Sequence, residues 1–125
     1  MKIGVCIKRV PATDTRIKIS DPSAGVDLSD VTWKVNPYDE FAIEQALLFR
    51  EAGSASEIAL MTVDGPEAES QLREGLARGK RGKDAGKAIR LDDPSFAGSD
   101  ALGVARILAA AVKKEGIGLV LMGKQ

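Results

Sequence analysis

Two apolar runs in the sequence each end in charged side chains that could contact a ligand. Lys8 and Arg9 follow the run Ile3–Ile7, and Asp64 follows the run Ile58–Val63. The two cations could steer a phosphate group, although solvent is the commoner environment for such a pair. A carboxylate at a strand end could accept a hydrogen bond from a ribose hydroxyl, or it could cap the helix that follows. These residues could therefore bind the polar groups of a ligand.

The segment Asn36-Pro37-Tyr38-Asp39-Glu40 has the composition of a helix start. Asn36 is a strong N-cap residue and Pro37 suits the first helical position, while acidic residues are favoured in the first turn by the helix dipole. Capping alone explains Asn36 and Pro37. The alternative is that the backbone from Asn36 to Asp39 also meets the edge of a ligand, and both interpretations stay open at this point.

Residues for catalysis are scarce in this chain. It has 125 residues, one cysteine and no histidine, which excludes a histidine-ligated metal site, a histidine-based triad and an internal disulfide bond. The cysteine, Cys6, lies in the first apolar run and is expected to be a small core residue whose backbone could touch a ligand. Basic and acidic residues number 18 each, so no net charge attracts nucleic acid or an anionic membrane. We assign no catalytic and no metal-binding residue.

Apolar runs and turn residues predict alternating strands and helices. Strands are expected at Ile3–Ile7, Ile58–Val63, Ala88–Leu91 and Ile117–Met122. Helices are expected at Pro37–Ala52, from Pro66 to Gly79, and at Ala101–Glu115. Between the first strand and the first helix, two short pieces, Arg16–Ile19 and Val31–Val35, are expected to form a small hairpin with Trp33 as its packing anchor.

This alternation predicts an α/β fold in which residues 1–125 form one domain. Helices between successive strands imply right-handed crossovers and an open parallel sheet, in a three-layer α/β/α arrangement. The first, second and fourth strands lack polar alternation, which favours burial on both faces. A ligand of such a sheet binds outside the carboxyl ends of the strands, so Lys8, Asp64, Asp92, Gly123 and the helix start should share one edge.

Two glycine-containing segments fail as phosphate-binding loops. The glycines of Gly82–Lys87 are one residue too close together for a P-loop, and Gly116–Leu121 leads into a strand and lacks the third glycine of the dinucleotide fingerprint. The basic stretch from Arg78 to Arg90 contains no aromatic residue on which a base could stack. A solvated loop, or a docking edge for an acidic partner, is therefore favoured over a nucleic-acid interface.

Four segments form a pattern that occurs together in one protein family. They are Val5-Cys6-Ile7-Lys8-Arg9-Val10, Asn36-Pro37-Tyr38-Asp39-Glu40-Phe41-Ala42-Ile43-Glu44, Asp64-Gly65-Pro66 and Leu121-Met122-Gly123-Lys124-Gln125. The chain resembles, almost end to end, the N-terminal half of the electron transfer flavoprotein beta subunit family. Members of the family are longer, so the chain is expected to be truncated at the end of its fourth main strand.

The resemblance implies a Rossmann-like, adenine-nucleotide-binding fold that is also found in universal-stress proteins. A beta subunit of this family supports electron transfer from flavin dehydrogenases to the respiratory chain or another acceptor, with no bond-making catalysis of its own. It binds AMP or a second FAD, and a further FAD is shared with the alpha subunit, its partner in a heterodimer. Carried over position by position, the pocket would use Cys6, Asn36, Pro37, Tyr38, Asp39 and Asp64, with a segment just beyond Gln125.

A second interpretation stays open, namely a stand-alone adenine-nucleotide-binding module of universal-stress type that associates with itself. An adenylating enzyme on the same fold is disfavoured because no glycine-rich phosphate-binding loop follows the first strand. The chain start lacks a signal-peptide pattern and no apolar run approaches the roughly 20 residues of a membrane span, so a cytoplasmic protein without a span is expected. The open edge after the fourth strand predicts a partner, a missing segment or a homodimer.

Overall fold

The computed structural model describes residues 1–12, 18–21, 23, 25–27, 31–79 and 86–124. The main strands are β1 (Lys2–Cys6), β6 (Glu57–Val63), β7 (Lys87–Leu91) and β8 (Leu119–Met122). They form a four-stranded sheet in the order β7-β6-β1-β8, and every neighbouring pair is parallel. The predicted open parallel sheet is confirmed, and β8 lies on the opposite side of β1 from β6 and β7, so the strand order reverses beside β1.

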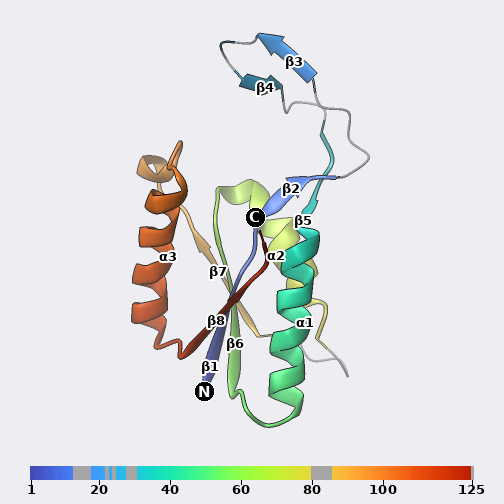
Figure 1. Cartoon of the computed structure of the whole chain (residues 1–125), viewed down its shortest axis with the longest axis vertical. Coiled ribbons are helices and arrows are strands. Elements are labelled where there is room, and N and C mark those ends of the chain that lie inside the picture. The colour runs from blue at the N-terminus through green and yellow to red at the C-terminus, as the bar shows by residue number, and fades with distance from the viewer. Residues whose placement is uncertain (13–17, 22, 24, 28–30, 80–85, 125) are drawn as a thin grey trace.

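Helices cover both faces of this sheet, as Figure 1 shows. Helices α1 (Pro37–Glu51) and α2 (Glu69–Leu76) lie on one face, and α3 (Ala101–Glu115) lies on the other. The three-layer α/β/α arrangement is therefore confirmed. The second helix is shorter than predicted, because a 3₁₀ turn at Pro66–Ala68 precedes α2. A second such turn, Pro94–Phe96, comes before α3.

Local signals in the sequence account for where the long helices begin and end. The Asn36 side chain accepts a hydrogen bond from the backbone N–H of Tyr38, at 3.1 Å, and so caps α1. Asp100 caps α3 by accepting from the backbone N–H of Gly103 at 2.8 Å. Gly116 then ends α3 with a φ of 66°, a left-handed conformation that favours glycine. These three predicted helix boundaries are confirmed.

Two apolar clusters hold the layers together, one on each face of the sheet. Alternate residues of β1 point to opposite faces, so Ile3 and Val5 pack with Ile43 and Leu47 of α1, while Cys6 packs on the side of α3. The side chains of Ile3, Val5 and Ile43 have no exposed surface. The expected core role of Cys6 is confirmed by its burial.

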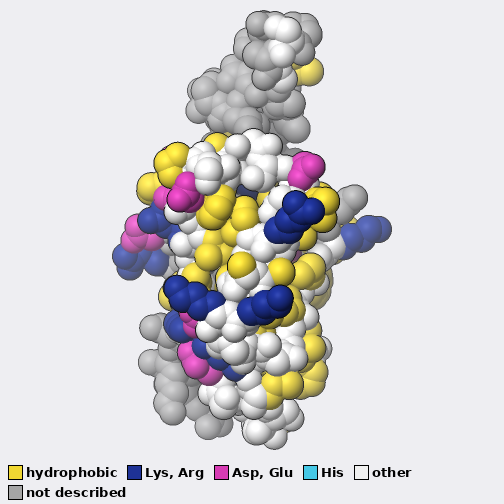
Figure 2. Space-filling view, turned by 90° about the vertical axis from the view of Figure 1, so that its left-hand side faces the viewer, with side chains coloured by type: hydrophobic (Ala, Val, Ile, Leu, Met, Phe, Trp, Pro, Cys, Tyr) yellow, Lys and Arg dark blue, Asp and Glu magenta, His cyan; other side chains and the backbone are white. Residues whose placement is uncertain are grey.

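The fourth strand is less buried than the sequence predicted. Residues 119–121 are only partly buried and Met122 is 60% exposed. The reason is that β8 lies at the edge of the sheet while α3 packs against β6. A groove of about 820 Å³ with mostly apolar side chains results between α3 and β8. Figure 2 shows hydrophobic side chains gathered down the middle of this face, with Lys and Arg side chains on either side.

The region between β1 and α1 differs from the predicted hairpin. Strand β2 (Arg9–Pro11) pairs antiparallel with β5 (Trp33–Val35), and β3 (Lys18–Asp21) pairs with β4 (Gly25–Asp27). The expected pairing of 16–19 with 31–35 is therefore wrong, although Arg16 and Ile17 lie outside the described residues. The β2 strand was missed because only three residues form it and one of them is proline. Figure 1 shows β3 and β4 beyond the β2–β5 ribbon, away from the main sheet.

Ion pairs join α3 to the amino end of the sheet. The Glu115 carboxylate accepts from the Lys87 ammonium at 2.6 Å and from the Lys2 ammonium at 3.1 Å. These bonds, that from Lys87 above all, hold the pKa of Glu115 below its ordinary value.

Among the described helices, none combines the length and the apolar character that a bilayer span requires.

The packing of α1 can be tested by comparing two neighbouring leucines. Leu47 is 1% exposed, whereas Leu48 is 46% exposed on the outer side of the same helix. Leu47→Ala should lower the free energy of unfolding by about 3 kcal/mol, because it leaves a cavity among well-packed side chains. Leu48→Ala should change it by less than about 0.5 kcal/mol. Urea unfolding followed by circular dichroism measures both, and equal effects of the two variants would contradict the burial described.

Candidate functional site

One buried carboxylate joins three elements at the carboxyl edge of the sheet. The Asp39 side chain, on the first turn of α1, accepts from the backbone N–H of Lys8 at 2.9 Å and from that of Gly123 at 3.0 Å. The backbone N–H of Asn36 also donates to the Lys8 carbonyl at 2.8 Å. The end of β1, the start of α1 and the end of β8 therefore meet at one place, as the strand-end argument predicts.

The electrostatics of Asp39 reflect this position. Burial raises the pKa of its carboxyl group above the ordinary value, and the N–H groups of Lys8 and Gly123 oppose that rise. Both carboxylate oxygens are occupied by backbone donors. Asp39 is therefore a structural tie at the edge of the site.

Gly123 fits this tie because it has no side chain. A Cβ atom built at this position would lie 2.6 Å from the Asp39 backbone nitrogen and would also collide with the Tyr38 carbonyl carbon. Both obstacles are backbone atoms, which cannot move aside as a flexible side chain could. The close approach of β8 to the start of α1 therefore requires glycine here.

A second polar cluster lies at the end of β6. The Arg9 Nε donates to Asp64 Oδ2 at 2.6 Å, and the guanidinium lies 4.2 Å from the centre of the Trp33 ring. The Arg9 side chain is 17% exposed, so the expected solvent-facing role is wrong for Arg9, whereas Lys8, at 60%, does face solvent. Trp33 anchors the β2–β5 ribbon by stacking on Arg9.

Asp64 has a different hydrogen-bonding role from the helix cap that its sequence position suggested. Its Oδ1 accepts from the neighbouring N–H of Gly65 at 2.8 Å, and α2 has no side-chain cap. Capping fails because the turn beginning at Pro66 places the α2 start further along the chain. Burial raises the pKa of the Asp64 carboxyl group, but the bonds from Arg9 and Gly65 and the nearby charges outweigh burial and lower it overall.

Two adjoining cavities open at this edge. The inner cavity, about 170 Å³, lies between the ends of β1 and β6 and α3, and its lining includes Cys6, Asp39, Thr62, Leu108 and Met122. The outer cavity, about 350 Å³, is lined by the residues that follow β6 and β7 and by the turn before α3. Three residues, Lys8, Val63 and Val104, line both cavities.

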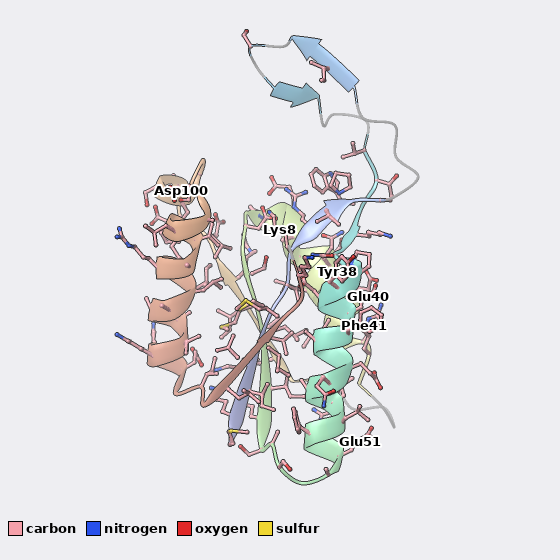
Figure 3. All side chains as sticks on the ribbon, viewed as in Figure 1. Lys8, Tyr38, Glu40, Phe41, Glu51 and Asp100 are labelled. Atoms are coloured by element: carbon pink, nitrogen blue, oxygen red, sulfur yellow. The ribbon has the colours of Figure 1, made fainter. Side chains whose placement is uncertain are left out.

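The two cavities include only part of the predicted site. Cys6 and Asp39 line the inner cavity and Asp64 lines the outer one, whereas Asn36, Pro37 and Tyr38 line neither. Asn36 is buried as the α1 cap, and Tyr38 is 55% exposed. Figure 3 shows Tyr38 at the upper end of α1.

Sequence reasoning missed the wall that α3 and the preceding turn supply. Val104 and Leu108 from α3, and Phe96 to Ser99 before it, contribute to the cavities. The spacing of Val104 and Leu108 by one helical turn was a signal that they share a face. That pattern indicated packing in the core. The spacing is the same for a helix face that packs in the core and for one that lines a cavity.

Thr62 is among the residues that line the inner cavity, but its side chain is buried elsewhere. Thr62 is 2% exposed, and its hydroxyl has no hydrogen-bond partner within the described structure. Thr62 follows Met61 along β6, and Met61 packs on the α3 side, so the Thr62 side chain points to the other face with Leu60. The Thr62 hydroxyl is therefore not available to a ligand in the inner cavity, to which α3 and β8 supply apolar walls.

The thiol at this site is not activated. Burial, followed by the nearby Asp39 charge, raises the pKa of the Cys6 thiol to about 11, so Cys6 stays protonated and poorly nucleophilic at neutral pH. Among the described residues, no group of three or more His, Cys, Asp or Glu side chains could hold a metal ion. The arrangement suits a planar apolar ring in the inner cavity with a polar tail in the outer one.

Comparison with known proteins gives the family. A family model described as "Electron transfer flavoprotein domain" matches residues 25–125. The chain belongs to the electron transfer flavoprotein family. It is 33% identical over 125 residues to the electron transfer flavoprotein subunit beta of Bradyrhizobium diazoefficiens. It is 39% identical over 127 residues to the caffeyl-CoA reductase-Etf complex subunit CarD of Acetobacterium woodii, and 39% over 116 residues to Protein FixA of Azorhizobium caulinodans.

The matches cover nearly the whole of this flavoprotein-family chain but less than half of each relative. The alignments include 100% of the chain for the subunit beta and CarD relatives and 93% for FixA. They include 47%, 46% and 39% of those relatives, respectively. The chain therefore spans about half the length of the curated beta subunits that it resembles.

The raised pKa of Asp39 predicts how stability depends on pH. Its pKa in the folded protein lies above 3.8, so the folded state holds this proton more tightly than the unfolded chain does. The resulting stabilisation is complete below pH 3.8 and is lost as the pH rises through the raised pKa. Urea unfolding of the wild type and of Asp39→Asn between pH 3.5 and 7 measures this contribution.

Asp39→Asn is the reference because an amide does not titrate. The wild type should lose stability relative to the variant as the pH rises, with most of the change near the folded-state pKa. A relative stability that instead increases with pH would show that the N–H donors of Lys8 and Gly123 outweigh burial.

Proposed function

We propose that this chain is the nucleotide-binding part of an electron transfer flavoprotein beta subunit. Its ligand is an adenine nucleotide, AMP or the adenosine part of a second FAD. In this role the chain supports electron transfer from flavin dehydrogenases to the respiratory chain or another acceptor. The single observation that carries the proposal is the pair of adjoining cavities at the carboxyl edge of the sheet, in a chain of this family.

The inner cavity fits the adenine ring by its chemistry. Leu108 and Met122 supply apolar surface, as the faces of a purine require. The Cys6 thiol, a weak donor, and the Asp39 carboxylate also line this cavity and are the polar groups that the edge of the ring would meet. A purine has donors and acceptors only in its plane, so apolar walls with polar groups at the edge match its two kinds of surface.

The outer cavity suits the sugar and phosphate that would follow the base. It continues from the inner cavity past Lys8 and Val63 and is the larger of the two. Because Asp64 already accepts from Arg9 and Gly65, it orients the residues beside a ribose and has limited remaining capacity to bind a hydroxyl. Asn36, Pro37 and Tyr38 would act by fixing the start of α1 around Asp39.

The proposal extends to partners through the family. The redox flavin is FAD shared with an alpha subunit, and the alpha and beta subunits form a heterodimer. Support comes from the relatives, which are named as beta subunits of electron transfer flavoproteins or as a subunit of an Etf complex. The stand-alone universal-stress interpretation has no comparable support, because the family match covers residues 25–125.

A substitution that fills the cavities tests the nucleotide site. Val104 lines both cavities, so Val104→Phe should place an aromatic ring where the ligand must enter. Adenosine binding, followed by ¹H–¹⁵N NMR chemical-shift titration, should weaken by about tenfold or more, a loss of about 1.4 kcal/mol. Ala110→Phe is the control, since Ala110 is exposed on the same helix.

The position of the shifted amides provides a second readout. In the wild type, adenosine should shift the amides of Lys8, Val63 and Gly65, while Ala110→Phe should bind like the wild type. No saturable shift at these amides, or equal binding by wild type and Val104→Phe, would refute a nucleotide site at this edge. Circular dichroism of each variant verifies that the fold is retained.

A further inference from the structure

We propose that Lys8 is the residue that recognises the nucleotide phosphate, and that Arg9 keeps Lys8 available by neutralising Asp64. This inference rests on the proposed nucleotide site and assigns different roles to two neighbouring cations, one in direct binding and one in pairing with a carboxylate. The positions of the two side chains, the occupied hydrogen-bonding capacity of the nearby carboxylates and the place of Lys8 between the cavities support it.

Lys8 lies where a ligand would pass from the inner cavity to the outer one. It lines both, whereas the carboxylates of Asp39 and Asp64 each line one. Its side chain is 60% exposed, and Figure 3 shows the residue in the space between the upper ends of α1 and α3. A base in the inner cavity would therefore have its phosphate near this ammonium group.

The backbone of Lys8 is fixed while its side chain has little to hold it. Its N–H donates to Asp39 at 2.9 Å and its carbonyl accepts from the N–H of Asn36 at 2.8 Å. The ammonium group lies 3.9 Å from Asp64 Oδ2, at the limit of an ion pair. An exposed pair at such a distance contributes little, so the ammonium can move to a phosphate at small cost.

Arg9 is committed in a way that Lys8 is not. It binds Asp64 at 2.6 Å and stacks on Trp33, and its side chain is 17% exposed. Arg9 is therefore a poor candidate for contact with a ligand. Its effect is indirect, because a carboxylate already paired with a guanidinium attracts the Lys8 ammonium less strongly.

The remaining carboxylates of the outer cavity are also engaged. Asp92 accepts from Arg90 at 2.8 Å, and Asp93 accepts from the Ser95 N–H at 2.9 Å and from the Ser95 hydroxyl at 2.7 Å. Among the described residues that line the two cavities, Lys8 is the cation. The local charge pattern thus provides one mobile positive group beside carboxylates that already have donors.

Comparing AMP with adenosine isolates the phosphate contact. Lys8→Gln should weaken AMP binding by about tenfold while leaving adenosine binding unchanged, because charge-assisted hydrogen bonds to phosphate are lost and the base contacts are kept. Lys114→Gln, an equal change of charge on the exposed end of α3, should alter neither affinity by more than about twofold. NMR titration of each variant with each ligand, at fixed ionic strength, gives the four affinities.

The outcomes separate this inference from the proposed function. If Lys8→Gln weakens AMP and adenosine equally, or weakens neither, the phosphate role of Lys8 is overturned while adenosine binding still upholds the nucleotide site. If the wild type binds neither ligand at the cavity residues, the proposed function fails and the inference fails with it.

A rescue experiment tests the indirect role of Arg9. Arg9→Gln should weaken AMP binding by several-fold, because the freed Asp64 carboxylate would then attract the Lys8 ammonium. Adding Asp64→Asn should restore AMP binding toward the wild-type value, whereas a merely structural role of the ion pair predicts further loss. Failure of the double variant to recover, with its fold verified by circular dichroism, would overturn the competition between Lys8 and Arg9.

Discussion

The hydrogen bonds from two backbone N–H groups to the Asp39 carboxylate are the constraint on which the site depends. They connect Lys8, two residues beyond β1, and Gly123, directly after β8, to the first turn of α1. The backbone ladder sets the register of β1 and β8, and the Asp39 side chain then holds the segments beyond these two strands against the helix. Asp39 does so at the cost of burying a charge, and the absence of a side chain at Gly123 allows the approach.

The hydrogen bonds of Asp39 also fix the position of the two cavities. The backbone of Lys8 is held from both sides, by Asp39 and by Asn36, so the wall between the inner and outer cavities is fixed before any ligand enters. A preformed wall avoids the entropy loss of ordering it on binding. The helix start that resembles a binding motif thus acts mainly through the backbone that it positions, with Asn36 and Pro37 behind the cavity rather than in it.

The sequence predicted the fold more fully than the site, and the reasons differ between elements. Strong periodic signals and caps such as Asn36, Asp100 and Gly116 act locally, so the helices they bound were predictable. The β2–β5 pairing depends on contacts between residues far apart in the chain, and its strands are too short to carry a pattern. The Arg9–Asp64 ion pair could not be predicted for the same reason, because 55 residues separate its members. The α3 wall was missed because an apolar helix face looks the same whether it lines a core or a cavity.

The distribution of charge at the sheet edge is the basis on which a chain without net charge is proposed to bind an anion. What a ligand meets depends on which charges already have partners, and net charge does not report this. Asp39 is occupied by backbone donors, Asp64 by Arg9 and Asp92 by Arg90, so these three carboxylates repel a phosphate less than their number suggests. Among the described residues that line the two cavities, the cation is Lys8, whose backbone is fixed and whose side chain is exposed. In the proposed site, pairing of the acidic residues would give the edge its selectivity, and the Lys8 ammonium would need only to reach the phosphate.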